Sequence, residues 1–338
     1  MHSRTVASLI VGSLVSAGCL WYAFRGVNLS AVAVGIGEVG LFWVLASVAG
    51  ALLGLVIRAI RWRFLVAGGE AIGSWSLVSA TYIGIMANNV LPARLGEVVR
   101  AWVLAQRERT SMPTVLASIV VERLLDVITA VALLGLALAL SPDLGGEAAG
   151  ILKRTGQAVL AVVAVLTVAL LVVLRFRERF LDAGERWAAR IGHSWASTTL
   201  EQIRRFVEGL GELRGGGRTA AVVGLSLLVW IVAIASFHMM ARGFQLGLTP
   251  VQTTLVFVVV LFGVAIPSAP GFVGTFHGFC VAGLTMVAGT GPNQAAAYAT
   301  LLHGSQWLAV NAVGAWFLWS DRVSWAALAG IEKQEPQT

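Results

Sequence analysis

Long apolar runs alternate with short polar segments along most of the chain. A membrane-spanning helix needs about 20 consecutive apolar residues. Six uninterrupted runs fit this requirement: 5–24, 41–57, 113–140, 157–174, 219–241 and 295–319. Two further apolar stretches are interrupted, 75–106 by Pro92 and 250–289 by Pro267 and Pro270. The pattern predicts an all-α, polytopic membrane protein with about six full transmembrane helices.

The composition excludes a water-soluble domain. Of the 338 residues, 57% are hydrophobic and only 12% are charged, whereas soluble domains carry roughly 25% charged residues. The net charge is +7, and most of the basic residues are arginines. An excess of basic residues in cytoplasmic loops explains this charge better than nucleic-acid binding does. The two cysteines lie far apart in apolar runs and predict neither a disulfide framework nor a metal site.

The loop arginines predict an orientation. Arg58, Arg61 and Arg63 follow the second apolar run, and nine arginines lie between Arg175 and Arg218. Basic loops stay in the cytoplasm, so we expect both segments, the N-terminus and the C-terminus on that side. The interrupted stretch 75–106 must then enter and leave the membrane from the cytoplasm, and 250–289 from outside. Both are predicted to be re-entrant helical hairpins.

The two hairpins share a short pattern. Pro92-x-x-x-Gly96-Glu97 aligns with Pro270-x-x-x-Gly274-Thr275, and the two units have opposite orientation. An inverted repeat of broken helices is typical of transporters with a binding site at the bilayer midplane. We therefore expect one transmembrane domain over 1–322 and a cytoplasmic tail over 323–338. Segment 176–215 reads either as a cytoplasmic amphipathic helical pair on the headgroups or as a solvated linker.

The first hairpin carries charge where charge is costly. Arg94, Glu97 and Arg100 fall broadly on one face of a helix that starts after Pro92. Glu97 can pair with either arginine, which leaves one positive charge over. That charge, a helix N-terminus and the amides of the preceding Asn88 and Asn89 would suit a phosphate. The alternative is a salt bridge that only braces the hairpin.

Run 113–140 holds a second charged group. Glu122 and Asp126 are four residues apart and share a face, and Arg123 can pair with Asp126. In an apolar helix such groups must face protein or water. They form either a counter-charge network for the first hairpin or an interfacial group that snorkels to the headgroups.

The second hairpin is poorer in charge. Pro270, Gly271 and Gly274 break the helix and allow close approach of backbone or lipid. His277 is the only ionisable residue in its break, AIPSAPGFVGTFHGF, and His303 lies in the last apolar run. The two histidines are either packed, hydrogen-bonded residues or a proton relay.

Three motifs together resemble the transmembrane region of the lysylphosphatidylglycerol synthase/flippase family. They are LPARLGEVVRAW, VVERLLD and PSAPGFVGTFHGF, and the resemblance covers roughly 5–320. It implies an inner-membrane protein that moves or binds lipids between leaflets. Better-known relatives add a soluble aminoacyl-transferase domain; these 338 residues contain none, so we expect no lysyl-lipid synthesis. Where relatives commonly have a glutamate and an arginine in the second half, this chain has His277 and His303.

The expected function is therefore lipid translocation in a bacterial or archaeal cytoplasmic membrane. The expected partner is an anionic or zwitterionic phospholipid or a polyprenyl-phosphate-linked lipid, and a homo-oligomer is compatible with the sequence. No nucleotide-binding, zinc-protease or nucleophile-elbow motif occurs, so we expect no enzyme, cofactor or metal. Two alternatives stay open: a non-transporting scaffold or regulator of a lipid-modifying complex, and a membrane glycosyl or lipid transferase.

Overall fold

The described parts of the chain are helical throughout. A computed structural model describes residues 2–66, 68–91, 95–140 and 216–322, with isolated positions between 150 and 204, and no strand occurs in these parts. The elements in order are α1 (His2–Phe24), α2 (Leu29–Gly37), α3 (Leu41–Arg63), α4 (Ser74–Val90), α5 (Gly96–Glu108), α6 (Met112–Ala139), α10 (Gly216–Gly243), α11 (Pro250–Ala265), η2 (Pro270–Phe272), α12 (Thr275–Ala288) and α13 (Pro292–Ser320). The predicted all-α class is confirmed.

Five of the six predicted runs are single helices, α1, α3, α6, α10 and α13. The sixth, 157–174, lies outside the described residues except for isolated positions, as do segment 176–215 and the tail 323–338. Three helical segments are long and apolar enough to cross a membrane, Leu41–Arg63, Gly217–Gly243 and Pro270–Ala288. A fourth span results if α1 and α2, which meet at 80°, count as one. Six full spans with two re-entrant hairpins stay a prediction.

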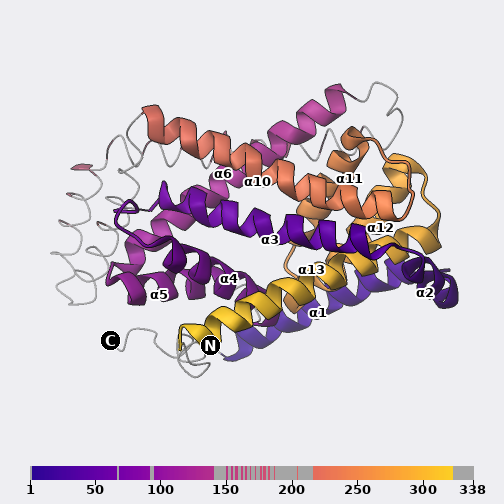
Figure 1. Cartoon of the computed structure of the whole chain (residues 1–338). Coiled ribbons are helices and arrows are strands. Elements are labelled where there is room, and N and C mark those ends of the chain that lie inside the picture. The colour runs from indigo at the N-terminus through magenta and orange to yellow at the C-terminus, as the bar shows by residue number, and fades with distance from the viewer. Residues whose placement is uncertain are drawn as a thin grey trace.

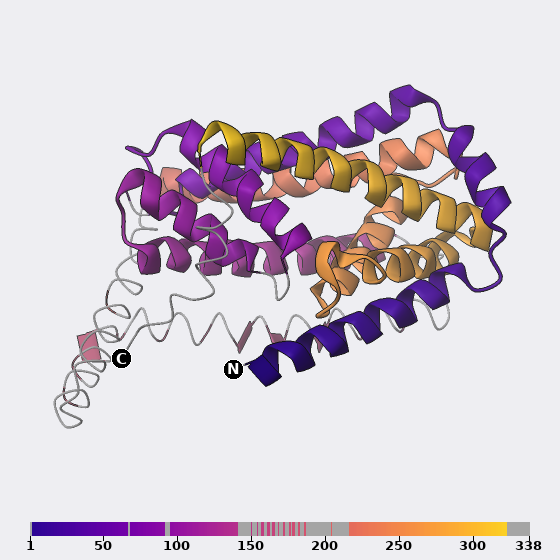
Figure 2. The same cartoon turned by 90° about the horizontal axis from the view of Figure 1, so that it is seen from below.

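The two helical hairpins lie at opposite ends of an elongated bundle. Figure 1 shows α4 and α5 at one end, α11 and α12 at the other, and α3 and α10 side by side between them. The view from below shows the same separation, with α13 running past both hairpins (Figure 2). Each end has its own buried hydrophobic cluster, one around α4–α6 and one around α10–α13. The centre of the bundle is therefore where the two hairpins can meet.

The first hairpin is closed by a glycine contact and a cap. A Cβ built on Gly96 would lie 2.1 Å from the carbonyl oxygen of Gly84, so α5 approaches α4 as closely as backbone allows. Asn88 Oδ1 accepts a hydrogen bond from the Gly96 amide at 2.8 Å, which satisfies one of the free N–H groups at the start of α5. Asn88 was predicted to offer its amide to a ligand; here its oxygen holds the hairpin.

The second hairpin breaks at two glycines with positive φ. Gly271 has φ 69° and Gly274 has φ 99°, a backbone region that favours glycine. A Cβ on Gly274 would lie 2.3 Å from the carbonyl oxygen of Ser16 in α1. Ser16 Oγ in turn accepts a hydrogen bond from the Ala269 amide at 2.8 Å. Helix α1 therefore packs directly against the tip of the second hairpin.

The tips of the two hairpins touch. A Cβ on Gly271 would lie 3.2 Å from the carbonyl oxygen of Asn89 in α4 and 2.8 Å from Trp307 Nε1 in α13. Only a glycine leaves room for this approach. The predicted convergence of the two broken helices is seen here at the level of backbone contact.

Candidate functional site

Two carboxylates of α6 form the centre of a buried ionic cluster. Glu122 is 0% exposed and Asp126 is 5% exposed. Their spacing of four residues puts both on one face of α6, as the sequence predicted. Burial of both groups favours the predicted network over snorkelling at the interface, because a snorkelling carboxylate would reach water.

Two arginines of α3 each bind both carboxylates. Arg58 Nη1 lies 2.8 Å from Glu122 Oε1 and 2.8 Å from Asp126 Oδ2. Arg61 lies 3.2 Å from Glu122 and 2.8 Å from Asp126, and it also donates to Ser226 Oγ of α10. Its side chain is 0% exposed, whereas that of Arg58 is 12% exposed. The cluster therefore joins α3, α6 and α10.

The prediction that Arg58 and Arg61 are loop residues was wrong. They lie in the last two turns of α3, which continues to Arg63. The apolar run stops at 57, and basic residues after such a run usually mark a cytoplasmic loop. The signal that would have found them is their spacing: residues three apart face the same side of a continuing helix.

The first hairpin adds Arg100 to the cluster. Arg100 Nη1 lies 2.9 Å from Glu122 Oε2, and its guanidinium stacks 3.8 Å above the ring of Trp62. The indole N–H of Trp62 donates to Ser118 Oγ at 2.8 Å, which fixes the ring. The Nε and Nη2 atoms of Arg100 are buried and have no hydrogen-bond partner among the described residues.

Glu97 pairs with Arg123. The sequence predicted a pair with Arg94 or Arg100, and Arg94 lies outside the described residues. The Glu97–Arg123 distance is 2.7 Å, and Arg123 also reaches Asp126 at 3.4 Å, the contact that the sequence indicated. Their side chains are 28% and 41% exposed, so water weakens this bridge. Pro92 and Arg94 lie outside the described residues, and the roles assigned to them stay predictions.

The described cluster carries an excess positive charge. Four guanidinium groups (Arg58, Arg61, Arg100 and Arg123) face three carboxylates, which leaves one positive charge over. A buried excess charge is costly without a counterion. The arrangement is therefore suited to an anion, which would balance it.

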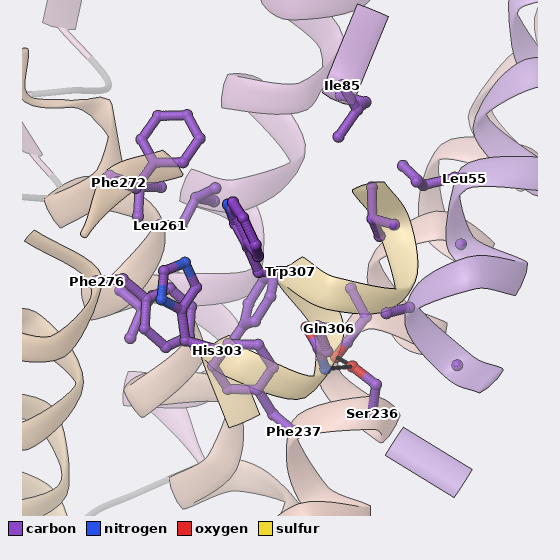
Figure 3. Close-up of a pocket in the computed structure, with 18 of the residues that line it drawn as sticks. Leu55, Ile85, Ser236, Phe237, Leu261, Phe272, Phe276, His303, Gln306 and Trp307 are labelled. Atoms are coloured by element: carbon purple, nitrogen blue, oxygen red, sulfur yellow. Dashed lines mark hydrogen bonds between the residues drawn. The ribbon is translucent and has the colours of Figure 1, made fainter. Parts of the chain in front are cut away.

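A cavity of about 300 Å³ lies between the two hairpins and reaches this cluster. In Figure 3, Phe272, Phe276 and Leu261 of the second hairpin lie on one side, Leu55 and Ile85 on the other, and Trp307 between them. Most of the wall is apolar. The polar lining residues are Arg58, Asn89, Ser236, His303, Gln306 and Trp307.

The predicted histidine pair is brought together at this cavity. The rings of His277 and His303 lie 5.1 Å apart at 83°, and His303 stacks on Phe276 at 4.5 Å. His303 lines the cavity, while His277 is 8% exposed and lies behind it. Pro270, Gly271 and Gly274 shape the hairpin tip. In the part of the chain that the structure describes, no group of three or more His, Cys, Asp or Glu could hold a metal ion.

Comparisons with known proteins point to one family. A family model described as the lysylphosphatidylglycerol synthase TM region matches residues 9–314. Glycosyltransferase AglD of Haloferax volcanii is 28% identical over 282 residues, which cover 73% of this chain. A UPF0104 membrane protein of Methanothermobacter thermautotrophicus is 25% identical over 263 residues, which cover 72% of this chain and 75% of the relative. This chain spans only 44% of the length of AglD. No solved structure matches.

Proposed function

Because this chain belongs to the family of the lysylphosphatidylglycerol synthase TM region, we propose that it is a lipid translocase. It moves a phosphate-bearing lipid, either a phospholipid or a polyprenyl-phosphate-linked lipid, between the two leaflets. The phosphate binds in the cavity between the hairpins, and the lipid tails stay in the bilayer. The observation that carries this proposal is a largely apolar cavity of about 300 Å³ that meets a buried cluster with an excess positive charge.

Arg58 is the residue we assign to the phosphate. It is the one arginine of the described cluster that lines the cavity. Its two carboxylate partners, Glu122 and Asp126, are also held by Arg61 at 3.2 and 2.8 Å. Arg58 can therefore turn toward a phosphate while both carboxylates keep a counter-charge. A guanidinium binds phosphate with two parallel hydrogen bonds, so this exchange replaces one ionic contact by another.

We also propose that both hairpins are re-entrant and form an inverted repeat. Their location at opposite ends of the bundle and the contact between Gly271 and Asn89 support this topology (Figures 1 and 2). Transporters built from inverted repeats bind substrate where broken helices meet at the midplane. An irregular backbone at that depth is tolerated where protein or a water-filled cavity covers it.

The proposed location is a bacterial or archaeal cytoplasmic membrane with both termini in the cytoplasm. Arg58 and Arg61 no longer count as loop charges, since they lie within helix α3. The nine arginines between Arg175 and Arg218 still favour this orientation. A basic juxtamembrane segment is also attracted to the anionic cytoplasmic leaflet.

Reconstituted liposomes with fluorescently labelled lipids test the proposal. We expect the native protein to move phosphatidylglycerol or a polyprenyl phosphate between leaflets, and Arg58→Gln to slow this at least tenfold. Arg242→Gln is the matched control, because Arg242 is exposed at the other end of the molecule. Absence of transport by folded native protein would refute the translocase and favour a scaffold or regulator.

A second candidate function comes from the relative AglD, which is named a glycosyltransferase. The alternative is that this chain helps to transfer a glycosyl group from a lipid-linked donor. Incubation of the purified protein with a radiolabelled lipid-linked sugar and an acceptor distinguishes the two. Label in the acceptor would establish transfer, while label that only changes leaflet would exclude it.

A further inference from the structure

We infer that the transported lipid has a phosphate and an otherwise uncharged headgroup, and that lipids bearing an ammonium group bind more weakly and move more slowly. This inference rests on the proposed function and adds the class of headgroup. It comes from which charges and which hydrogen-bonding groups the cavity wall presents.

Among the described residues that line the cavity, none is acidic. The nearest carboxylates, Glu122 and Asp126, lie behind the wall and are engaged by Arg58 and Arg61 at distances between 2.8 and 3.2 Å. An ammonium in the cavity would lose its water and find no counter-charge. Transfer of a charge out of water is highly unfavourable unless it is paired.

The excess positive charge of the cluster also disfavours an ammonium group in the cavity. Four arginines against three carboxylates give the described cluster a positive sign. In a poorly hydrated interior, electrostatic effects are several times stronger than in water. The cluster therefore attracts the phosphate and repels an ammonium attached to it, so a zwitterionic headgroup gains little from Arg58.

Two lining groups can only donate hydrogen bonds. Guanidinium and indole have N–H donors and no acceptor, and both Arg58 and Trp307 contribute to the wall. The Trp307 Nε1 atom is buried and has no partner among the described residues. A hydroxyl or phosphate oxygen would satisfy it, whereas an ammonium, which is also donor-only, would not.

The remaining polar groups fit hydroxyls. Asn89 and Gln306 carry amides, which both donate and accept. Gln306 is held in place, since its Nε2 donates to Ser47 Oγ at 3.1 Å and lies 3.4 Å from Ser236 Oγ. Positioned amides at a mostly apolar wall are typical of sites that recognise uncharged polar ligands. Glycerol and sugar headgroups both have this chemistry.

The test compares headgroups on identical acyl chains in proteoliposomes. We expect phosphatidylglycerol to move on the order of tenfold faster than phosphatidylethanolamine, and lysyl-phosphatidylglycerol to move slowest. Asn89→Asp places a carboxylate in the cavity wall and should reduce or reverse the preference for phosphatidylglycerol over phosphatidylethanolamine. Asn293→Asp is the control, because Asn293 lies at the opposite end from the cluster and outside the cavity lining.

The outcomes separate this inference from the proposed function. Equal rates for phosphatidylglycerol and phosphatidylethanolamine would overturn the headgroup rule and leave the translocase intact. An unchanged preference in Asn89→Asp would also count against the role of the missing carboxylate. If folded protein moves none of the lipids, the proposed function fails and this inference fails with it.

Discussion

Replacement of Glu122 by glutamine removes the central carboxylate of the ionic cluster, while the side chain keeps nearly the same shape. Glu122 contacts Arg58 at 2.8 Å, Arg61 at 3.2 Å and Arg100 at 2.9 Å. After the change, Arg58 and Arg61 still hold Asp126, each at 2.8 Å. Arg100 loses the one carboxylate within 4 Å that the described residues offer it.

The expected cost follows from that single orphaned charge. Removing one partner of a buried ion pair costs about 3–5 kcal/mol, because the other charge stays buried without compensation. Stacking of Arg100 on Trp62 is present with and without Glu122, so it does not change this cost. We therefore expect Glu122→Gln to lower the free energy of unfolding by about 3–5 kcal/mol. Unfolding in mixed detergent micelles, followed by tryptophan fluorescence, measures this.

Glu97→Gln is the matched control. Its bridge to Arg123 is as short, 2.7 Å, but both side chains are partly exposed. Exposed bridges contribute about 0–1 kcal/mol. The double variant Glu122→Gln/Arg100→Met should lose less stability than the sum of its two single changes, because the unpaired guanidinium of Arg100 is removed. Equal losses of stability in Glu122→Gln and Glu97→Gln would contradict a larger contribution from the buried ion pair.

Three further predictions concern the hairpin breaks. In thermal unfolding, Gly274→Ala should be destabilised by about 1–3 kcal/mol, since φ is 99° and the new methyl group meets the backbone of α1. The control Gly224→Ala, whose Cβ meets nothing within 4 Å, should be as stable as the native protein. Asn88→Ala should cost about 1 kcal/mol, because α5 loses its cap, and a stability equal to native would contradict that role. Arg94→Ala, from the sequence alone, should abolish lipid transport in proteoliposomes. Native rates would show that Arg94 takes no part in phosphate binding and would leave that role to Arg58.

The long apolar runs were sufficient to predict most helices and the two broken helix pairs, whose re-entrant course stays a prediction. Long apolar runs determine helix positions because a bilayer requires backbone hydrogen bonds within each segment. The breaks can also be predicted locally, because Pro270 fixes its own φ and Gly274 permits a positive φ. The predicted hairpins 75–106 and 250–289 therefore lie close to the helix pairs observed at 74–108 and 250–288.

The partners of the charges were harder to predict. Glu122, Arg123 and Asp126 were recognised because charge inside an apolar run is conspicuous. Arg58 and Arg61 were not, since their burial results from packing of α3 against α6 and α10, residues distant in sequence. Likewise, the pairing of Glu97 with Arg123 depends on how the first hairpin packs against α6. The local sequence around Glu97 does not indicate this packing.

A bulky side chain in the cavity would show whether lipid headgroups pass between the two hairpins. Gly54 lines the cavity, and a Cβ built there meets nothing within 4 Å, so a phenylalanine side chain has open space to fill. Lipid translocation by Gly54→Phe in proteoliposomes should fall at least tenfold while its unfolding temperature stays near that of the native protein. Gly224→Phe, equally open but outside the cavity lining, should transport normally. Native rates for Gly54→Phe would contradict passage of the lipid headgroup between the two hairpins.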